Sequence, residues 1–305
     1  RRLFEREDQP RMAVEPPPEE TLRMLGELKR LAANPAEPAG KRVLFLTGLE
    51  SEDKDFGIDY FPVLAQMLRR QGFTPWSESP ARLTPEALRD CAMVVLSEEC
   101  ALIYNRLVQG KFPTMLRNYV SEGGSLLLLI SSNPYRPNSN RSVLLSRILR
   151  PAFRIQQEGI CENPRACGNG DPLQIRATDL KSDHPISSNV KAVQFFVASS
   201  LRLMDPRWTA VVRAAQDDLR QKGQPVVAAG EFGQGRIVVA GDSLWLAPGR
   251  VEEADNLQFL QNVIDWLGRR PVSRCDREAV LRELPVTAER MRGAREANRA
   301  KEQEK

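Results

Sequence analysis

The sequence predicts an α/β fold with a doubly wound, mostly parallel sheet, and three features point to it. Along residues 41–150, short continuous apolar runs alternate with amphipathic stretches. Continuous apolar runs of strand length are typical of strands buried on both faces, and their alternation with helices is typical of a parallel sheet. Further along, a glycine turn leads into the apolar run 236–240, and an amphipathic stretch follows at 254–267. That order is expected for the last strand and helix of an open α/β sheet.

The elements of the first half can be placed in order. Thr84 is a typical N-cap and Pro85 suits the first helical position, so we expect a helix to begin there. Gly123 and Gly124 end the helix that starts at Phe112. The expected strands are 41–47, 72–76, 92–96 and 125–130, and the expected helices are 60–71, 84–90, 112–121 and 138–149, the last one ending at Pro151. Right-handed crossovers between these strands place helices on both faces of the sheet.

Between residues 153 and 229, short β-like segments replace the helices. They are 153–157, 173–177, 193–204 and 209–214. We expect this β-rich segment to be an insertion or an antiparallel extension of the sheet. Residues 225–231 and 236–240 are then expected to pair as a hairpin across the Gly-containing turn between them.

The two ends of the chain differ from the middle. Residues 1–40 hold a charged, proline-rich stretch, a short helix with leucines on one face, and a linker. Residues 275–305 alternate in charge, which is typical of a solvated helix, and a partner-binding helix is the alternative. We predict an N-terminal arm at 1–40, an α/β domain at 41–268 and a helical tail at 269–305, with protein partners bound through the two arms.

Composition and charge narrow the classes of partner. A hydrophobic content of 41% and a charged content of 28% are ordinary for a soluble domain. The net charge is only +4 and both signs are interspersed, so no nucleic-acid partner is expected. No apolar run reaches the roughly 20 residues of a membrane helix. If the chain belongs to a membrane-associated complex, we expect another protein of that complex to provide the membrane helix. The chain begins at Arg1 and not at Met, which favours a removed leader and export.

The cysteines agree with an exported protein. No pair has CxxC spacing and the chain has one His, so no metal site of the zinc type is expected. Cys161 and Cys167 flank a loop-like segment and could close a small disulfide, which would suit an oxidising compartment. Two free thiols are the alternative. The expected location is therefore extracytoplasmic or periplasmic.

Polar residues that follow the strands form the candidate binding crevice, because ligands of open α/β sheets bind at the carboxyl ends of the strands. They are Asp53, Asp55, Ser97, Glu98, Ser132, Asn133, Asp242 and Ser243. Acidic loops can bind cations, but they are commonly just solvated, and no phosphate-binding loop is present. We therefore expect no metal and no cofactor. For Asp242 and Ser243 we favour a local role, because these residue types bond the backbone where a strand enters a loop.

Nucleophilic catalysis would have to use His184, the one histidine, with Ser131 or Cys100 as nucleophile. No glycine flanks Ser131, so the strained turn that exposes a nucleophile is not encoded. Cys100 has no basic neighbour in the sequence to activate its thiol. His184 precedes a proline in an extended segment, where a structural role is more common. The residues therefore argue against an enzyme.

Seven motifs taken together resemble the class I glutamine amidotransferase-like superfamily. They are Val43–Thr47, Ala92–Leu96, Tyr119–Leu129, Asp183–Ile186, Phe232–Arg236, Gly241–Ser243 and Asn256–Leu267. The chain is most similar to the non-catalytic branch, which includes a domain of a ciliary intraflagellar-transport subunit, extracytoplasmic domains of gliding-type ABC-transporter auxiliary proteins, and bacterial domains of unknown function. The Gly-x-Cys-x-Gly turn and the late His-x-Glu pair of the enzymes are absent.

The resemblance implies a flavodoxin-like, amidotransferase-like sheet over residues 41–268 and a transport-associated pseudoenzyme that binds or assembles other proteins. Three functions are therefore weighed. The first is a non-enzymatic scaffold or binding module in a larger assembly. The second is a cryptic hydrolase that uses Ser131 or Cys100 with His184. The third is a sugar- or small-ligand-binding domain without chemistry.

Overall fold

The computed structural model describes most of the central part of the chain. The described residues are 41–46, 58, 61–78, 83–97, 112–130, 149–162, 173–216, 218 and 220–282. They all belong to one compact unit, Ala39–Lys305. The predicted N-terminal arm and most of the predicted C-terminal tail lie outside them. No helix within the described ranges is long and apolar enough to cross a membrane.

An eight-stranded mixed sheet forms the centre of the domain, with strand order β2-β1-β3-β4-β12-β11-β10-β7. In that order the strands are Thr74–Glu78, Arg42–Leu46, Cys91–Ser97, Ser125–Leu129, Gly235–Ala240, Pro225–Phe232, Trp208–Arg213 and Asp179–Leu180. The pairs from β2 to β12 are parallel, and the pairs from β12 to β7 are antiparallel. The predicted α/β class and mostly parallel sheet are therefore confirmed.

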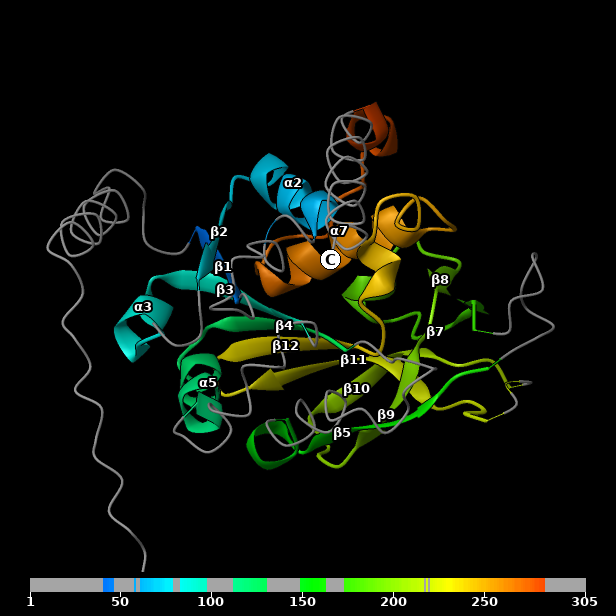
Figure 1. Cartoon of the computed structure of the whole chain (residues 1–305), viewed down its shortest axis with the longest axis horizontal. Coiled ribbons are helices and arrows are strands. Elements are labelled where there is room, and N and C mark those ends of the chain that lie inside the picture. Colours follow the sequence, from blue (N-terminus) through cyan, green and yellow to red (C-terminus); the bar gives the residue numbers. More distant parts are fainter. Residues whose placement is uncertain are drawn as a thin grey trace, which may run out of the picture. The chain divides into compact units, whose positions relative to one another are not determined.

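Helices cover both faces of this sheet. The helices α2 (Pro62–Arg70) and α7 (Asn256–Leu267) contribute to one hydrophobic cluster, and α3 (Pro85–Arg89) and α5 (Phe112–Ser121) contribute to the other. Figure 1 shows α2 and α7 above the sheet and α5 below it. Strand β1 supplies residues to both clusters, alternating along its length. This alternation explains why its sequence is apolar throughout.

Local sequence rules place several element boundaries correctly. The Thr84 hydroxyl accepts a hydrogen bond from the Ala87 N–H, 3.2 Å, and caps α3 as predicted. Gly233, in the two-residue turn between β11 and β12, has a φ of +62°, which glycine adopts without steric cost. Helix α5 occupies the predicted residues.

Two predicted boundaries are wrong. Residues 149–153 are helical, so Pro151 lies within a helix and does not end one. The proline removes only its own donor, and the Arg154 N–H still bonds to the Arg150 carbonyl, 3.0 Å. The segment predicted to be a solvated helix from Cys275 onward is not solvated at its start, because residues 277–282 are helical and Val280 is 2% exposed in the core.

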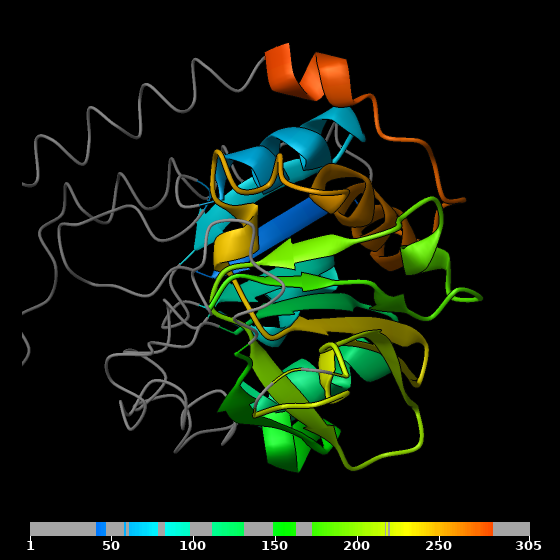
Figure 2. The ribbon, with the colours of Figure 1, turned by 90° about the vertical axis from the view of Figure 1, so that its right-hand side faces the viewer.

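The β-rich segment divides into an extension of the main sheet and two small sheets. Strands β10 and β7 extend the main sheet, as one of the two predictions has it. Strands β5 (Ile155–Ile160) and β9 (Ser199–Leu203) pair separately, as do β6 (Ile175–Ala177) and β8 (Val193–Phe195). Figure 2 shows these green strands beside the main sheet. Two residues of the segment, Phe196 and Ser199, bond to Asp242 and Gly241 at the carboxyl end of β12.

Candidate functional site

Asp242 lies at the carboxyl end of β12, and its side chain is 0% exposed. One carboxylate oxygen, Oδ2, accepts a hydrogen bond from the Phe196 N–H at 2.7 Å. The other, Oδ1, accepts one from the Leu244 N–H at 2.7 Å. The carboxylate thus joins the end of β12 to a chain segment 46 residues away and starts the short helix η4 (Leu244–Leu246). These are the contacts of a structural residue.

Gly241, just before Asp242, lets the β-rich segment approach the end of β12. A Cβ at this position would lie 1.9 Å from the Ser199 carbonyl oxygen, which is backbone and cannot move cheaply. The Ser199 N–H donates to the Gly241 carbonyl at 2.7 Å, and the Gly241 N–H donates to the Val226 carbonyl at 2.8 Å. Backbone therefore occupies the space beside the end of β12.

Cys161 belongs to the same buried region and is a free thiol with 0% exposure. Burial raises its pKa far above the ordinary range, and the nearby charges of Asp218 and Asp242 raise it further. A thiol in this environment stays protonated and is a poor nucleophile. Cys167 lies outside the described residues, so the Cys161–Cys167 disulfide stays a prediction.

Of the predicted crevice residues, the structure brings Ser97, Asp242 and Ser243 to one edge of the sheet. Ser97 ends β3, which is separated from β12 by β4 alone. All three side chains are buried, with at most 2% exposed. The Ser243 hydroxyl has no hydrogen-bond partner among the described residues. The candidates outside the described residues are Asp53, Asp55, Glu98, Cys100, Ser131, Ser132 and Asn133.

His184 lies at the opposite edge of the sheet. Its ring is 5.4 Å from the ring of Trp266, in the last turn of α7. Arg236, near the start of β12, stacks over the same indole and donates to the Trp266 carbonyl at 2.8 Å. About 20 Å of strand separates Arg236 from Asp242. His184 is therefore far beyond hydrogen-bond reach of the carboxyl edge, where a proton transfer would have to occur.

Local contacts account for the His184 side chain. Its Nδ1 accepts a hydrogen bond from the Ile186 N–H at 3.2 Å and caps the short helix η3 (Pro185–Ser187). Burial lowers the pKa of His184, so the neutral ring is favoured. The neighbouring Asp183 carboxylate is paired with Lys181, 2.7 Å from its Nζ, and does not orient the imidazole. Within the described ranges, no group of His, Cys, Asp and Glu is arranged to hold a metal ion.

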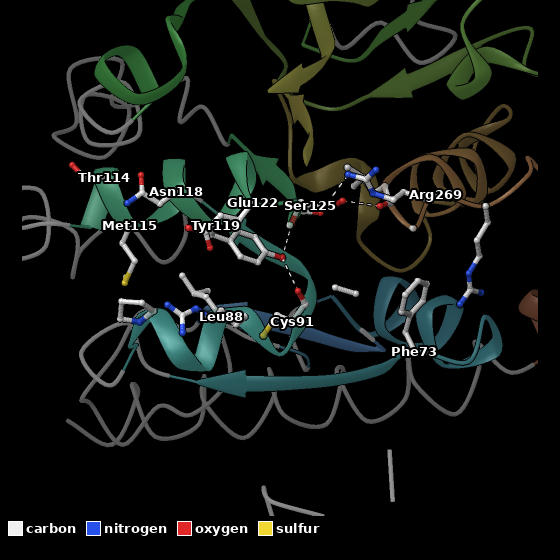
Figure 3. A pocket seen from close by; sticks show the side chains of 18 residues that line it. Phe73, Leu88, Cys91, Thr114, Met115, Asn118, Tyr119, Glu122, Ser125 and Arg269 are labelled. Carbon is white, nitrogen blue, oxygen red and sulfur yellow. Dashed lines mark hydrogen bonds between the residues drawn. The ribbon is translucent and has the colours of Figure 1, made fainter. Parts of the chain in front are cut away.

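A cavity of about 940 Å³ lies at the amino edge of the sheet, and none of the predicted candidate residues is among those that line it. It is bounded by α3, α5, the first residues of β3 and β4, and the end of α7 (Figure 3). The Tyr119 hydroxyl lies 3.2 Å from both the Cys91 and Ser125 carbonyl oxygens. Burial raises the pKa of the Cys91 thiol to about 11, so this cysteine is unreactive as well.

No family model matches the sequence, and no curated protein matches it. Solved structures do match the fold. The "mmIFT52 N-terminal domain" superposes with a TM-score of 0.54 at 16% identity, over 74% of this chain and 96% of that one. Two cytoplasmic proteins of Salmonella typhimurium match similarly. STM3548 has a TM-score of 0.52 at 14% identity over 76% of this chain and 99% of its own. STM1381, from strain LT2, has 0.50 at 15% identity over 74% and 99%.

At these identities the matches show a shared fold and nothing more. The predicted likeness to an intraflagellar-transport domain is confirmed at that level. The chain therefore has the fold of the IFT52 N-terminal domain and of two Salmonella cytoplasmic proteins.

Proposed function

We propose that this chain is a non-enzymatic, amidotransferase-like domain that binds other proteins within a larger assembly. The observation that carries the proposal is that the Asp242 carboxylate is occupied by hydrogen bonds within the protein. Asp242 lies at the carboxyl end of a strand, where the residues of an α/β sheet normally contact a ligand. Both of its oxygens bind backbone N–H groups, and its side chain is 0% exposed. A carboxylate committed in this way is not available to a substrate.

The placement of His184 argues against the alternative of a cryptic hydrolase. A nucleophile at the carboxyl edge needs a base within about 3 Å. The chain's one imidazole caps η3 and packs against Trp266, near the amino end of β12. Its Nδ1 is already an acceptor for the Ile186 N–H. These contacts support a structural role for His184 and argue against it as the base of a nucleophile at the carboxyl edge.

Active-site probes test the absence of enzymatic chemistry. Native protein is treated with a fluorophosphonate and, separately, with iodoacetamide, and labelled peptides are mapped by mass spectrometry. We expect no labelling of Ser131 or Cys100 above that of the urea-unfolded control. Labelling of either residue that disappears in His184→Asn would restore the hydrolase. The Asn side chain can still accept the Ile186 N–H, so the variant keeps the cap.

The assembly role rests on the predicted arms at residues 1–40 and 269–305, for which the sequence predicts charged segments with helical stretches. Isolation of the tagged chain from its own cells, followed by size-exclusion chromatography, tests it. We expect a stoichiometric complex that dissociates when residues 1–40 or the residues beyond 282 are deleted, with residues 269–282 kept because Val280 belongs to the core. A lone monomer of 34.3 kDa with freely protease-sensitive arms would contradict the proposal. An extracytoplasmic location is part of the proposal, and fractionation of the same cells tests it.

A further inference from the structure

The cavity at the amino edge has the size and composition of a small-molecule site. Its volume of about 940 Å³ falls within the range of known ligand pockets, about 300–1,000 Å³. Figure 3 shows Leu88 of α3 and Met115 of α5 at one end, with Phe73 and Arg269 at the other. Phe73 and Leu88 are buried in the hydrophobic core clusters, and Met115 packs against one. The walls are therefore fixed and largely apolar.

Three arginines, Arg89, Arg269 and Arg270, line this apolar space. Glu122 is the one acidic side chain among the eighteen lining residues. None of the three arginines forms an ion pair with another residue that the structure describes. Arg270 is held in place, because its guanidinium stacks over the Phe73 ring at 4.3 Å and donates to the Gln71 carbonyl. The lining thus carries an excess of two positive charges.

Arg269 and Arg270 directly follow α7, where a basic residue often serves only to bond the last carbonyls of a helix. Here other donors bond those carbonyls. The Ser125 hydroxyl donates to the Leu267 carbonyl at 2.7 Å, and Arg236 donates to the Trp266 carbonyl at 2.8 Å. Among the residues that the structure describes, the guanidinium of Arg269 makes one long bond, 3.4 Å, to the Gly123 carbonyl. Most of its donors are left for a ligand.

The backbone at Arg269 gives a second indication. Its φ is +56°, a left-handed conformation that glycine adopts freely and a long side chain adopts at a cost. A position directly after a helix with this conformation is commonly glycine. Arg269 therefore occupies a position whose backbone conformation favours glycine.

We propose that this cavity binds an amphiphilic organic anion, with its apolar body against Pro85, Ala92 and Met115 and its carboxylate at Arg269. The apolar walls and the uncompensated arginines match the two halves of such a molecule. This binding activity goes beyond the proposed assembly role and does not depend on it. It lies at the edge of the sheet opposite to Asp242.

Titration calorimetry with decanoate tests the proposal, at concentrations well below micelle formation. We expect saturable binding of decanoate to the full chain and much weaker binding of decyltrimethylammonium, which has the same chain length and the opposite charge. Arg269→Gly should weaken decanoate binding about tenfold, because a charge-assisted hydrogen bond is lost. The same variant should be at least as stable to urea as the wild type, since glycine relieves the backbone strain.

Arg154→Gly is the matched control. Arg154 also has a left-handed backbone, with φ +52°, and its Nε donates to the Met204 carbonyl, away from the cavity lining. Decanoate affinity should be unchanged in this variant. Met115→Trp, which fills the cavity from a half-buried helix position, should abolish binding.

Three results would overturn the proposal. They are no saturable decanoate binding, equal binding of the two amphiphiles, and equal losses in Arg154→Gly and Arg269→Gly. Cross-links from a partner polypeptide to the cavity face of α5, in place of decanoate binding, would assign the cavity to a protein partner. None of these results would bear on the contacts of Asp242.

Discussion

Replacement of Asp242 by Asn distinguishes a structural carboxylate from a functional one. The Asn side chain has nearly the same shape, but its NH₂ group cannot accept the hydrogen bond that one carboxylate oxygen receives. Either the Phe196 N–H or the Leu244 N–H, each 2.7 Å from the carboxylate, then loses its acceptor inside the protein. The loss of one charge-assisted bond and a buried unsatisfied donor together cost about 3 kcal/mol. Functional residues behave differently, since their replacement is commonly neutral or stabilising.

Urea unfolding followed by circular dichroism measures this change. Asp242→Asn should lower the free energy of unfolding by about 3 kcal/mol. Ser243→Ala is the control, because the neighbouring Ser243 side chain is equally buried and its hydroxyl has no partner among the described residues. Its removal should be neutral or slightly stabilising. An Asp242→Asn variant as stable as the wild type would refute a structural role for this carboxylate.

Three further predictions concern other buried groups. His184 has a lowered pKa in the folded state, so the unfolded chain binds more protons below pH 6.5, and stability should be present above that pH and decline as the pH falls below it. His184→Asn should remove this dependence, measured as urea midpoints at several pH values, and an unchanged slope would contradict it. The Cys161 thiol, with its raised pKa, should react with iodoacetamide at pH 8 only after unfolding, and fast labelling of native protein would contradict its burial. Gly241→Ala should destabilise by about 1–3 kcal/mol because its Cβ would overlap the Ser199 carbonyl, and a thermal melt like that of the wild type would show that the two segments do not touch.

The parallel half of the fold is predictable because its cues are local. Strands β1, β3 and β4 are apolar throughout because helices cover both faces. Thr84, Pro85 and the paired glycines after α5 mark helix ends through contacts made within a few residues. The β-rich segment has weaker cues, because edge pairing depends on strands far away in the chain. Its division into three sheets could not be foreseen.

The site depends on contacts between distant residues, which no single motif encodes. Phe196 supplies a backbone donor to Asp242 across 46 positions, and His184 meets the indole of Trp266 at the far end of α7. A local role for Asp242 could be predicted without knowledge of any distant contact. The hydrogen bond from the Leu244 N–H, two residues along the chain, agrees with that role. The amino-edge cavity has no sequence motif, because its walls come from five separate elements, α3, α5, β3, β4 and α7. The rule that ligands of open α/β sheets bind at the carboxyl ends of the strands also points to the carboxyl edge and not to the amino edge.

Cross-linking mass spectrometry in the cells that make this protein tests the account most directly. The account predicts recurrent cross-links from the arms at 1–40 and 269–305 to one defined set of partner proteins. It also predicts that the active-site probes leave Ser131 and Cys100 unlabelled in the same cells. Cross-links confined to the chain itself, together with probe labelling that requires His184, would show that this fold acts as an enzyme and not as a binding module.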